Sequence, residues 1–322
     1  MKAAVLRGPG RIEVCDMPIP HVGPGEVLVQ VQACGICGSD VHAYRTGLLS
    51  DVSVATSDGG RVLGHEFSGV VVEVAPDVRR LGVGDRVVGV ALGGFAEFVK
   101  VLVDDRNIHP LADSLTFQEG ATTEPLAVAY HAVAQVEAEA GDHVVIIGAG
   151  AIGLSCLQAV AGVAASVTVV DISRAKLHAA QSLGATHTVD ARSPSATEDV
   201  LTLLTRGGAA DGADAVLECA GARTTAEQAI RLVRPGHGRV GLLAFYERAP
   251  EWDLNEVIRR GITLRGCVAS TRRDFLNAIY AMTQGQAPRT PLISREFDLS
   301  DVHAAFELCS QDPDIIKVLL RP

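Results

Sequence analysis

The spacing of apolar and polar residues changes near residue 125 and divides the chain into two regions. Upstream of that point, short apolar runs alternate with turns that contain glycine. The runs Glu26–Gln32 and Gly69–Val74 are rich in Val, and another apolar run follows the turn Gly82–Asp85. Such runs are typical of short strands. The pattern therefore predicts a mostly β domain that extends from residue 1 to about residue 126.

Downstream of residue 126, strand-like and helix-like patterns alternate, which is typical of a doubly wound parallel sheet. The predicted strands are His143–Ile147, Ser166–Val170, Ala215–Glu218 and Arg239–Leu243, and the predicted helices are Ala127–Glu139, Ile152–Ala161, Arg174–Leu183 and Thr224–Leu232. We assign residues 127–269 to this second domain. A helix at Arg273–Gln284 and a helix–strand pair ending at Lys317–Leu320 are expected to return to the first domain, which then comprises residues 1–126 and 270–322.

One apolar segment resembles a membrane span in hydropathy. Val144–Val170 contains no charged residue, and its length is sufficient to cross a bilayer. Its glycines, the polar Ser155 and Gln158, and the Asp171 that follows it instead favour a buried strand–helix–strand unit. We therefore expect no membrane partner.

Charge and cysteine content narrow the function classes further. The formal net charge of −10 over 322 residues argues against nucleic acid and anionic membranes as partners. The seven cysteines are odd in number and scattered, and the first residues do not resemble an export signal. These features predict reduced thiols in a cytoplasmic protein.

A glycine signature in the second domain predicts a dinucleotide site. Gly148, Gly150 and Gly153 follow an apolar strand and open a helix, the context that the dinucleotide fingerprint requires. Gly148 permits the tight turn, Gly150 admits the pyrophosphate, and Gly153 allows the helix to pack on the strand. Free N–H groups at the helix start, at Ala151 and Ile152, favour phosphate binding.

The acidic residue at the end of the next strand indicates which dinucleotide binds. Asp171, eighteen residues after Gly153, is placed to accept hydrogen bonds from the adenosine ribose and to repel a 2′-phosphate. NAD is therefore favoured over NADP, although the nearby Arg174 could accommodate a 2′-phosphate. A flavin, or a glycine-rich turn that binds nothing, are the alternatives.

Residues suited to a catalytic zinc occur in the first domain, where such an ion keeps three protein ligands and one open position. Cys37 is the best thiolate candidate and His65 the best imidazole, whereas Glu66 and Glu124 are carboxylates within plausible reach. Asp40 suits the orientation of a ligand histidine through its second ring nitrogen. A metal together with a dinucleotide predicts redox chemistry between an alcohol and a ketone.

Several motifs spread over the whole chain resemble those of one family. They are Cys34–His42, Gly64–Gly69, Gly82–Val87, Gly94–Val99, Glu124–Ala127, Gly148–Gly153, Glu218–Gly221 and Asp314–Leu319. The chain resembles the zinc-dependent medium-chain dehydrogenases, and within them the polyol and secondary-alcohol branch of sorbitol, butanediol and threonine dehydrogenases. The resemblance implies an α/β fold in which a mostly β, GroES-like catalytic domain is joined to a Rossmann domain.

The resemblance also implies roles for individual residues. Cys37 and His65 correspond to catalytic zinc ligands, and Glu66 corresponds to a third ligand that is direct in some members and conditional in others. Glu124 stands where the alcohol branch has a cysteine and the polyol branch a glutamate, which favours the polyol branch. Whether Glu66 or Glu124 completes the zinc shell stays open.

Further roles implied by the resemblance concern proton transfer and the cofactor. Ser39 and His42 are expected to form a proton relay from the alcohol toward solvent. Lys176 is expected to contact the adenosine ribose beside Asp171. The family also suggests a homodimer or homotetramer.

The chain departs from the family pattern at one place. Many members carry a lobe with four closely spaced cysteines that bind a structural zinc, but here Val87–Leu92 runs almost directly into Gly93, and no cysteine lies between Cys37 and Cys156. We expect one catalytic zinc and no structural zinc. The polar segment Ser50–Gly60 could cover part of the active-site entrance in place of the lobe.

The expected function is therefore a reversible, zinc-dependent and NAD-linked oxidation of a secondary alcohol or polyol to a ketone. A zinc-free, NADPH-dependent quinone or enone reductase of the same superfamily is one alternative. A non-catalytic NAD-binding protein is another. The sequence does not determine which alcohol, polyol or amino alcohol is the small-molecule substrate.

Overall fold

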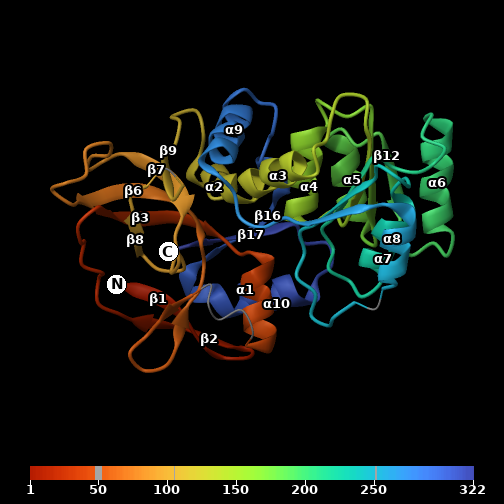
Figure 1. The fold of residues 1–322 in the computed structure, drawn as a ribbon. Coiled ribbons are helices and arrows are strands. Elements are labelled where there is room, and N and C mark those ends of the chain that lie inside the picture. Colours follow the sequence, from red (N-terminus) through yellow and green to blue (C-terminus); the bar gives the residue numbers. More distant parts are fainter. Residues whose placement is uncertain (48–52, 105, 251) are drawn as a thin grey trace. The chain divides into compact units, whose positions relative to one another are not determined.

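A computed structural model of the chain describes residues 1–47, 53–104, 106–250 and 252–322 (Figure 1). The chain divides into two units. The first comprises Met1–Glu124 and Thr271–Pro322, and the second comprises Pro125–Ser270. Both boundaries lie within two residues of those expected from the sequence.

The first unit is built on a seven-stranded sheet in which β16, β17, β3, β6, β7 and β9 follow one another, with β8 also paired to β3. These strands are β3 (Glu26–Gly35), β6 (Glu66–Val74), β7 (Arg86–Val90), β8 (Phe98–Leu102), β9 (Ile108–Pro110), β16 (Ile293–Asp298) and β17 (Lys317–Arg321). A smaller sheet contains β1 (Lys2–Gly8), β2 (Arg11–Asp16), β4 (Val54–Ala55) and β5 (Arg61–Val62). The mostly β domain predicted from the sequence is confirmed.

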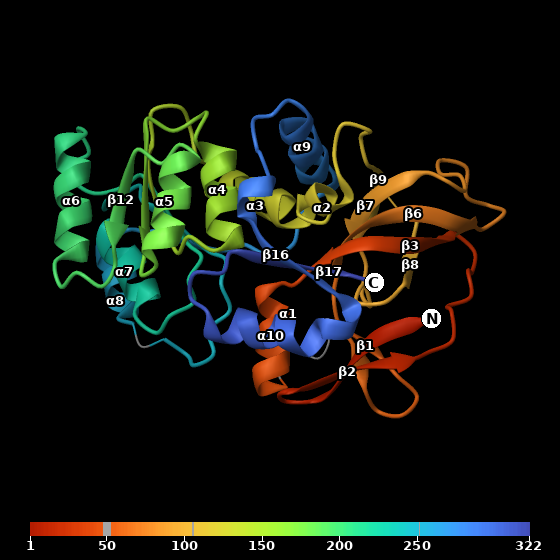
Figure 2. The same cartoon turned by 180° about the vertical axis from the view of Figure 1, so that it is seen from behind.

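The C-terminal segment completes this unit, as expected from the sequence. Strand β17 pairs antiparallel with β3, so that Leu320 lies opposite Cys34, and Figure 2 shows the blue strand beside the red one. The helical elements of the unit are α1 (Gly38–Thr46), α2 (Phe117–Gly120), α9 (Arg272–Thr283), η2 (Thr290–Leu292), η3 (Leu299–Asp301) and α10 (Val302–Gln311). The core includes the aromatic side chains of Phe67, Phe95 and Phe306, all fully buried.

The second unit contains a six-stranded, fully parallel sheet in the order β12, β11, β10, β13, β14, β15. Its strands are β10 (His143–Ile147), β11 (Ser166–Asp171), β12 (His187–Asp190), β13 (Ala215–Glu218), β14 (Arg239–Leu242) and β15 (Thr263–Gly266). Its helices are α4 (Ala151–Val160), α5 (Arg174–Ser182), α6 (Ala196–Arg206), α7 (Thr225–Leu232) and α8 (Leu254–Arg260), and α3 (Thr123–Gln135) begins at the unit boundary. The predicted doubly wound sheet is confirmed.

The order of these strands determines where a ligand can bind. Strands β11 and β12 lie on one side of β10, whereas β13, β14 and β15 lie on the other. The connection therefore reverses direction between β10 and β13, and in open parallel sheets ligands bind at the carboxyl ends of strands at such a switch point. The glycine signature follows β10 directly.

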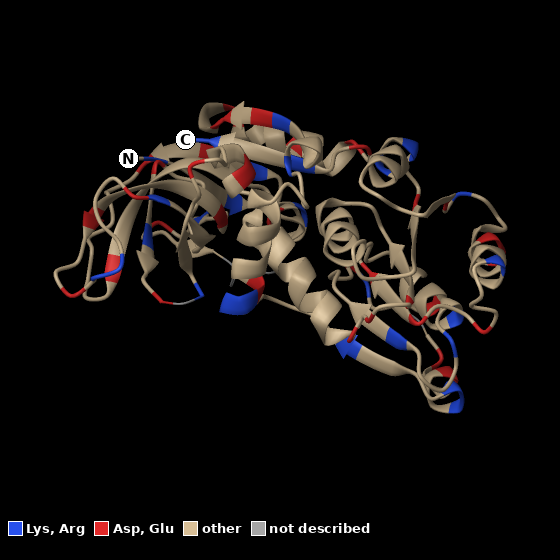
Figure 3. Cartoon of the chain, turned by 90° about the horizontal axis from the view of Figure 1, so that it is seen from above, with Lys and Arg blue, Asp and Glu red and all other residues tan. Residues whose placement is uncertain are grey.

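The apolar segment Val144–Val170 forms β10, α4 and most of β11, as predicted. Its strands pair with each other in parallel, and α4 is largely buried. No described helix is long and apolar enough to cross a membrane. Figure 3 shows acidic and basic residues interspersed along the ribbon, and the sum over the whole sequence is −10.

A short turn connects β7 to β8, at the place where the sequence departs from the pattern of the family that it resembles. A side chain at Gly93 would approach the Val54 Cγ2 atom to 3.1 Å, so β4 packs against this turn. Residues 50–52 of the polar segment Ser50–Gly60 lie outside the described residues. The coverage of the active-site entrance by this segment stays a prediction.

Candidate metal and dinucleotide sites

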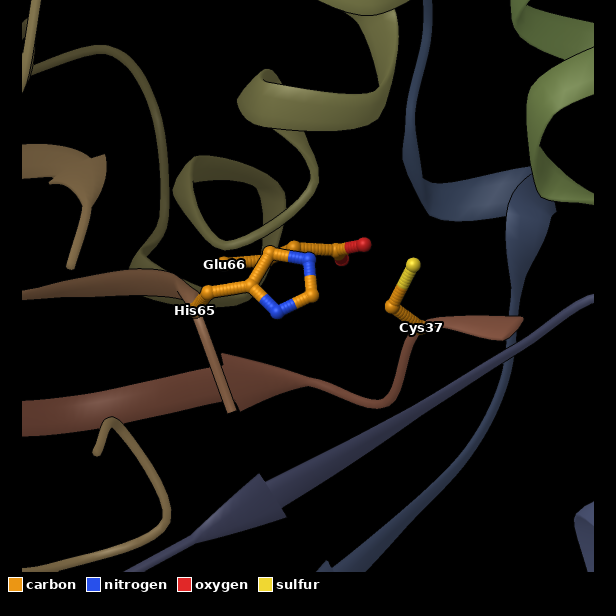
Figure 4. Close-up of side chains that lie close together, drawn as sticks. All are labelled: Cys37, His65 and Glu66. Atoms are coloured by element: carbon orange, nitrogen blue, oxygen red, sulfur yellow. The ribbon is translucent and has the colours of Figure 1, made fainter. Parts of the chain in front are cut away.

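Three of the residues predicted to bind zinc converge in the first unit. Cys37, His65 and Glu66 each offer one ligand atom, and these atoms all lie within 4.8 Å of one another (Figure 4). Cys37 caps the N-terminus of α1, His65 precedes β6, and Glu66 is the first residue of β6. Gly35 lies opposite Glu66 in the β3–β6 pair, and a side chain there would overlap the Glu66 carboxylate.

The donor set of this cluster fits a zinc ion. Thiolate, imidazole and carboxylate are the ligand types that zinc prefers. The Oε1 atom of Glu66 is buried and has no hydrogen-bond partner among the described residues, and the same is true of His65 Nδ1. An unpaired buried carboxylate oxygen is costly, and a bound cation would compensate that cost. Cys34, which lies next to this cluster in the sequence, is fully buried, and burial raises the pKa of its thiol.

Asp40 connects the segments that carry the cysteine and the histidine. Its buried carboxylate accepts hydrogen bonds from Cys37 N (2.9 Å) and Gly64 N (3.2 Å). The Oδ1 atom lies 3.8 Å from His65 Nδ1, a distance that allows electrostatic attraction but exceeds a hydrogen bond. Burial lowers the pKa of His65, but Asp40 and Cys37 raise it to a net value well above its usual range. Metal binding at His65 would therefore displace a proton.

Lys317 belongs to this site, although the sequence analysis gave it no role. Its Nζ atom donates to Glu66 Oε2 (2.6 Å) and to Ile36 O (3.0 Å), and both side chains of the ion pair are almost fully buried. Burial lowers the pKa of Lys317, yet the Glu66 charge raises it to a net value above its usual range. A single lysine within the apolar run Ile315–Leu320 was the available signal, since an unpaired lysine is rarely buried.

Glu124, the fourth predicted metal residue, lies in the first turn of α3 and is half-buried. It is not part of the group whose ligand atoms lie within 4.8 Å of one another. Burial and the neighbouring Glu66 charge raise the pKa of Glu124 to about 7, and Glu124 in turn raises the pKa of His65. The structure therefore places it close enough to interact electrostatically with the three-residue cluster.

The two residues of the predicted proton relay are located on α1, directly after Cys37. Ser39 and His42 are three residues apart and both half-buried, and residues at this spacing share a helix face. Their roles in proton transfer stay predictions.

In the second unit, the glycine turn has the geometry that the fingerprint predicts. Gly148 has a φ of +98°, in the region that favours glycine. A side chain at Gly153 would overlap the carbonyl of Gly148, whereas the space next to Gly150, the N-cap of α4, is open. Ala151 and Ile152 form the first residues of α4, so their N–H groups lie at the phosphate-binding end of the helix.

Asp171 also has a structural role, which was not predicted from the sequence. Its carboxylate accepts hydrogen bonds from Ala149 N (2.6 Å) and Ser173 N (2.7 Å), and so holds the glycine turn to the end of β11. A carboxylate has about four acceptor positions, which leaves capacity for ribose hydroxyls. Arg174 is exposed and forms an ion pair with Asp190 (3.3 Å), and Lys176 lies in the first turn of α5.

Glu218 is a second acidic residue at the switch point. It is fully buried at the end of β13 and accepts hydrogen bonds from Ala220 N, Gly221 N and the Tyr246 hydroxyl. Ala220 in turn packs against the position of Gly148. Glu218 therefore fixes the loop that faces the glycine turn, although the sequence analysis had only noted its motif.

Comparisons with known proteins identify the class to which this fold belongs, the alcohol and polyol oxidoreductases. Residues 23–113 match the model of the alcohol dehydrogenase GroES-like domain, and residues 151–284 match that of zinc-binding dehydrogenases. The chain is 32% identical to (R,R)-butanediol dehydrogenase of Bacillus subtilis over 100% of both chains. It is 30% identical to D-xylulose reductase of Saccharomyces cerevisiae, over 97% of this chain and 95% of the relative.

Solved structures of similar proteins have the same fold over almost their entire chains. An alcohol dehydrogenase from Escherichia coli CFT073 in complex with NADH superimposes with a TM-score of 0.87 at 25% identity, covering 100% of this chain and 99% of the other. A protein from Sinorhizobium meliloti 1021, assigned as a zinc-binding dehydrogenase and bound to NADP, gives 0.84 at 31% identity over 100% and 99%. The chain therefore belongs to the zinc-dependent medium-chain dehydrogenase family.

The buried ion pair of this site leads to a prediction about stability. Lys317→Met removes the cation and leaves the Glu66 carboxylate buried and unpaired. Loss of one partner of a buried pair typically costs about 3–5 kcal/mol. We expect a decrease of that size in the free energy of unfolding of metal-free protein, measured by urea denaturation in the presence of a chelator.

Two variants serve as controls for this prediction. The double variant Glu66→Gln/Lys317→Met should regain part of the lost stability, because no buried charge remains unpaired. Lys100→Met removes a half-exposed pair with Glu26 and should cost less than about 1 kcal/mol. Wild-type stability of Lys317→Met would show that the buried pair is not important for stability.

Proposed function

We propose that this protein is a zinc-dependent, NAD-linked dehydrogenase that reversibly oxidises a secondary alcohol or polyol to a ketone. One observation carries the proposal: Cys37, His65 and Glu66 lie together, and one buried carboxylate oxygen of Glu66 has no hydrogen-bond partner among the described residues. The curated relatives include dehydrogenases and reductases of butanediol, xylulose and sorbitol, which supports an alcohol or polyol as the substrate class.

Zinc, when bound, would polarise the alcohol oxygen and lower the pKa of the hydroxyl, and NAD would accept the hydride. Cys37 and His65 would hold the metal, with Glu66 as a carboxylate ligand and Glu124 close by. Ser39 would accept the hydroxyl proton, and His42 would carry it toward solvent. Their spacing on one face of α1 supports a common path for the proton.

Two properties of the sequence support a single zinc ion per chain. The turn between β7 and β8 spans only residues 91–97, and it contains no cysteine. We therefore propose a catalytic zinc without a structural one. We also propose a cytoplasmic location, since all seven cysteines are unpaired thiols, as expected in a reducing compartment.

The first experiment tests the metal ligands. The measured quantity is the rate of NAD⁺ reduction on a panel of secondary alcohols, polyols and threonine. Cys37→Ser and His65→Ala should each lower this rate by at least roughly 10³-fold, because each variant lacks one metal ligand. NADH binding, measured by fluorescence titration, should stay unchanged, because the glycine turn lies in the second unit. Metal analysis should find about one zinc per wild-type chain.

The wild-type protein provides the control for this experiment. Removal of the metal by a chelator should abolish turnover, and added zinc should restore it. Full turnover by either metal-depleted variant would exclude the proposed zinc centre. Zinc-free wild-type protein that reduces enones or quinones with NADPH would place the chain in the zinc-free branch of the superfamily.

Asp171 supports NAD over NADP, because a second negative charge next to its carboxylate would be repelled. Asp171→Asn removes that repulsion together with a charge-assisted hydrogen bond, worth about 1.5–3 kcal/mol. We expect NADH affinity to fall roughly 10- to 100-fold and the ratio of NADPH to NADH affinity to rise. Arg174→Gln is the matched control: NADH affinity should stay within about twofold of wild type, since the Arg174 side chain is 84% exposed. Unaltered selectivity in Asp171→Asn would contradict the assignment.

We propose that the protein forms homo-oligomers. Strand β15 is the last strand of the parallel sheet, and Leu254, Ile258 and Val268, which flank it in the sequence, are 55%, 76% and 69% exposed. Exposed apolar residues beside an unpaired strand edge are typical of interfaces.

Light scattering should give a mass of twice the 33.7 kDa chain or a higher multiple. Ile258→Lys should shift this mass toward the monomer, because it places a charge at the proposed contact. A monomeric wild type would contradict the oligomer.

A further inference from the structure

Arg289 is the largest of the fully buried side chains in the first unit, with 1% of its surface exposed. It directly precedes η2, in the segment that connects α9 to β16. A guanidinium cannot lose its charge in a protein, and its burial is therefore costly. The hydrogen bonds of Arg289 give this residue a role beyond packing.

The guanidinium reaches the turn that leads into α3. Arg289 Nε donates to Thr122 Oγ1 (3.1 Å), and the same hydroxyl donates to Glu119 O (2.7 Å). Thr122 and Thr123 are both fully buried. Because the hydroxyl uses both its acceptor and its donor capacity, Thr122 is held in one orientation.

Two further side chains of the same return segment contact this turn. Thr123 Oγ1 lies 3.5 Å from Met282 Sδ, and Thr290 Oγ1 donates to Glu119 Oε1 (3.2 Å). The segment Met282–Thr290 therefore contacts residues 119–123 at three side chains. We call this arrangement the strap.

The turn held by the strap is directly connected to the metal site. Glu124 follows Thr123 in the chain, in the first turn of α3. The carbonyl oxygen of Ala121 packs against Gly35, at 3.3 Å from the position that a side chain would take there. Gly35 itself lies opposite Glu66. A displacement of Thr122 would thus be transmitted to Glu124 on one side and to the Gly35–Glu66 pair on the other.

We propose that Arg289 is a positioning residue for the metal site: through Thr122 it fixes the backbone that presents Glu124 to Cys37, His65 and Glu66. The inference rests on the proposed zinc centre. Arg289 does not touch substrate or metal in this role. It acts on the position of the Glu124 carboxylate, in the way that residues hydrogen-bonded to metal ligands commonly orient those ligands.

The experiment uses the full-length protein, stripped of metal and reloaded with zinc or with cobalt(II). Zinc affinity is measured by competition with a chromophoric chelator, and the ligand geometry is read from the cobalt(II) absorption spectrum. The variants are Arg289→Met, Thr122→Val, which removes the acceptor, and Thr122→Ser, which retains the hydroxyl. Arg239→Met is the matched control, because Arg239 is a mostly buried arginine of the second unit that binds Glu137 O and Asp142.

We expect Arg289→Met and Thr122→Val to weaken zinc binding roughly 10- to 100-fold and to shift the cobalt(II) bands. They should lower kcat while leaving the KM for NAD⁺ unchanged. Thr122→Ser should retain wild-type affinity and spectrum. Arg239→Met should lower the thermal midpoint without altering either metal readout, which separates positioning from general stability.

Each result then has a distinct meaning. If Arg289→Met does not fold, the Thr122→Val and Thr122→Ser pair decides the question alone. Wild-type metal affinity and spectrum in Thr122→Val, in a protein whose wild type binds zinc and turns over, would overturn the positioning role only. A wild type that takes up neither zinc nor cobalt at Cys37 and His65 would overturn the proposed function together with it.

Discussion

Gly35 at the end of β3 is the position on which the metal site depends. In the large sheet of the first unit it lies opposite Glu66 of β6 on one side and opposite Leu319 of β17 on the other. Any side chain at this position would overlap the Glu66 carboxylate. The absence of a side chain therefore leaves room for the Glu66 carboxylate beside β3. The chain then continues directly to Cys37, the N-cap of α1.

The Glu66 carboxylate that occupies this space is buried, and a buried negative charge requires compensation. The Glu66 carboxylate is buried, with one oxygen paired to Lys317 and the other without a partner among the described residues. Asp40 is buried nearby and spans the segments of Cys37 and His65. Several acidic groups in a low-dielectric environment favour a cation. Lys317 supplies one fixed positive charge, and the unpaired Glu66 oxygen is suited to a metal ion.

The second unit also depends on a glycine, which here permits a close approach between two backbone segments. Gly153 lets α4 pack on the Gly148 carbonyl, and Asp171 holds the turn through the N–H of Ala149. On the other side of the switch point, Glu218 fixes the loop that packs against Gly148. The two loops at the predicted dinucleotide site are thus fixed by the carboxylates of Asp171 and Glu218, which accept hydrogen bonds from backbone N–H groups. The space next to Gly150 stays open.

The sequence by itself determined the class of fold, the glycine turn after β10 and three of the residues that gather at the candidate metal site, because periodicity, glycine spacing and ligand chemistry are local properties. It missed the four-residue strands β12 and β15 and the helix α8, whose short lengths give a weak periodic signal. It also missed α6, although the buried Ala196, Val200 and Leu204 recur there at the spacing of an amphipathic helix. Only the tertiary structure decided that Lys317 pairs with Glu66 and that Arg289 reaches Thr122, across sequence separations of 251 and 167 residues. Such pairs depend on strand register and on the return of the C-terminal segment, and no local pattern encodes either of them.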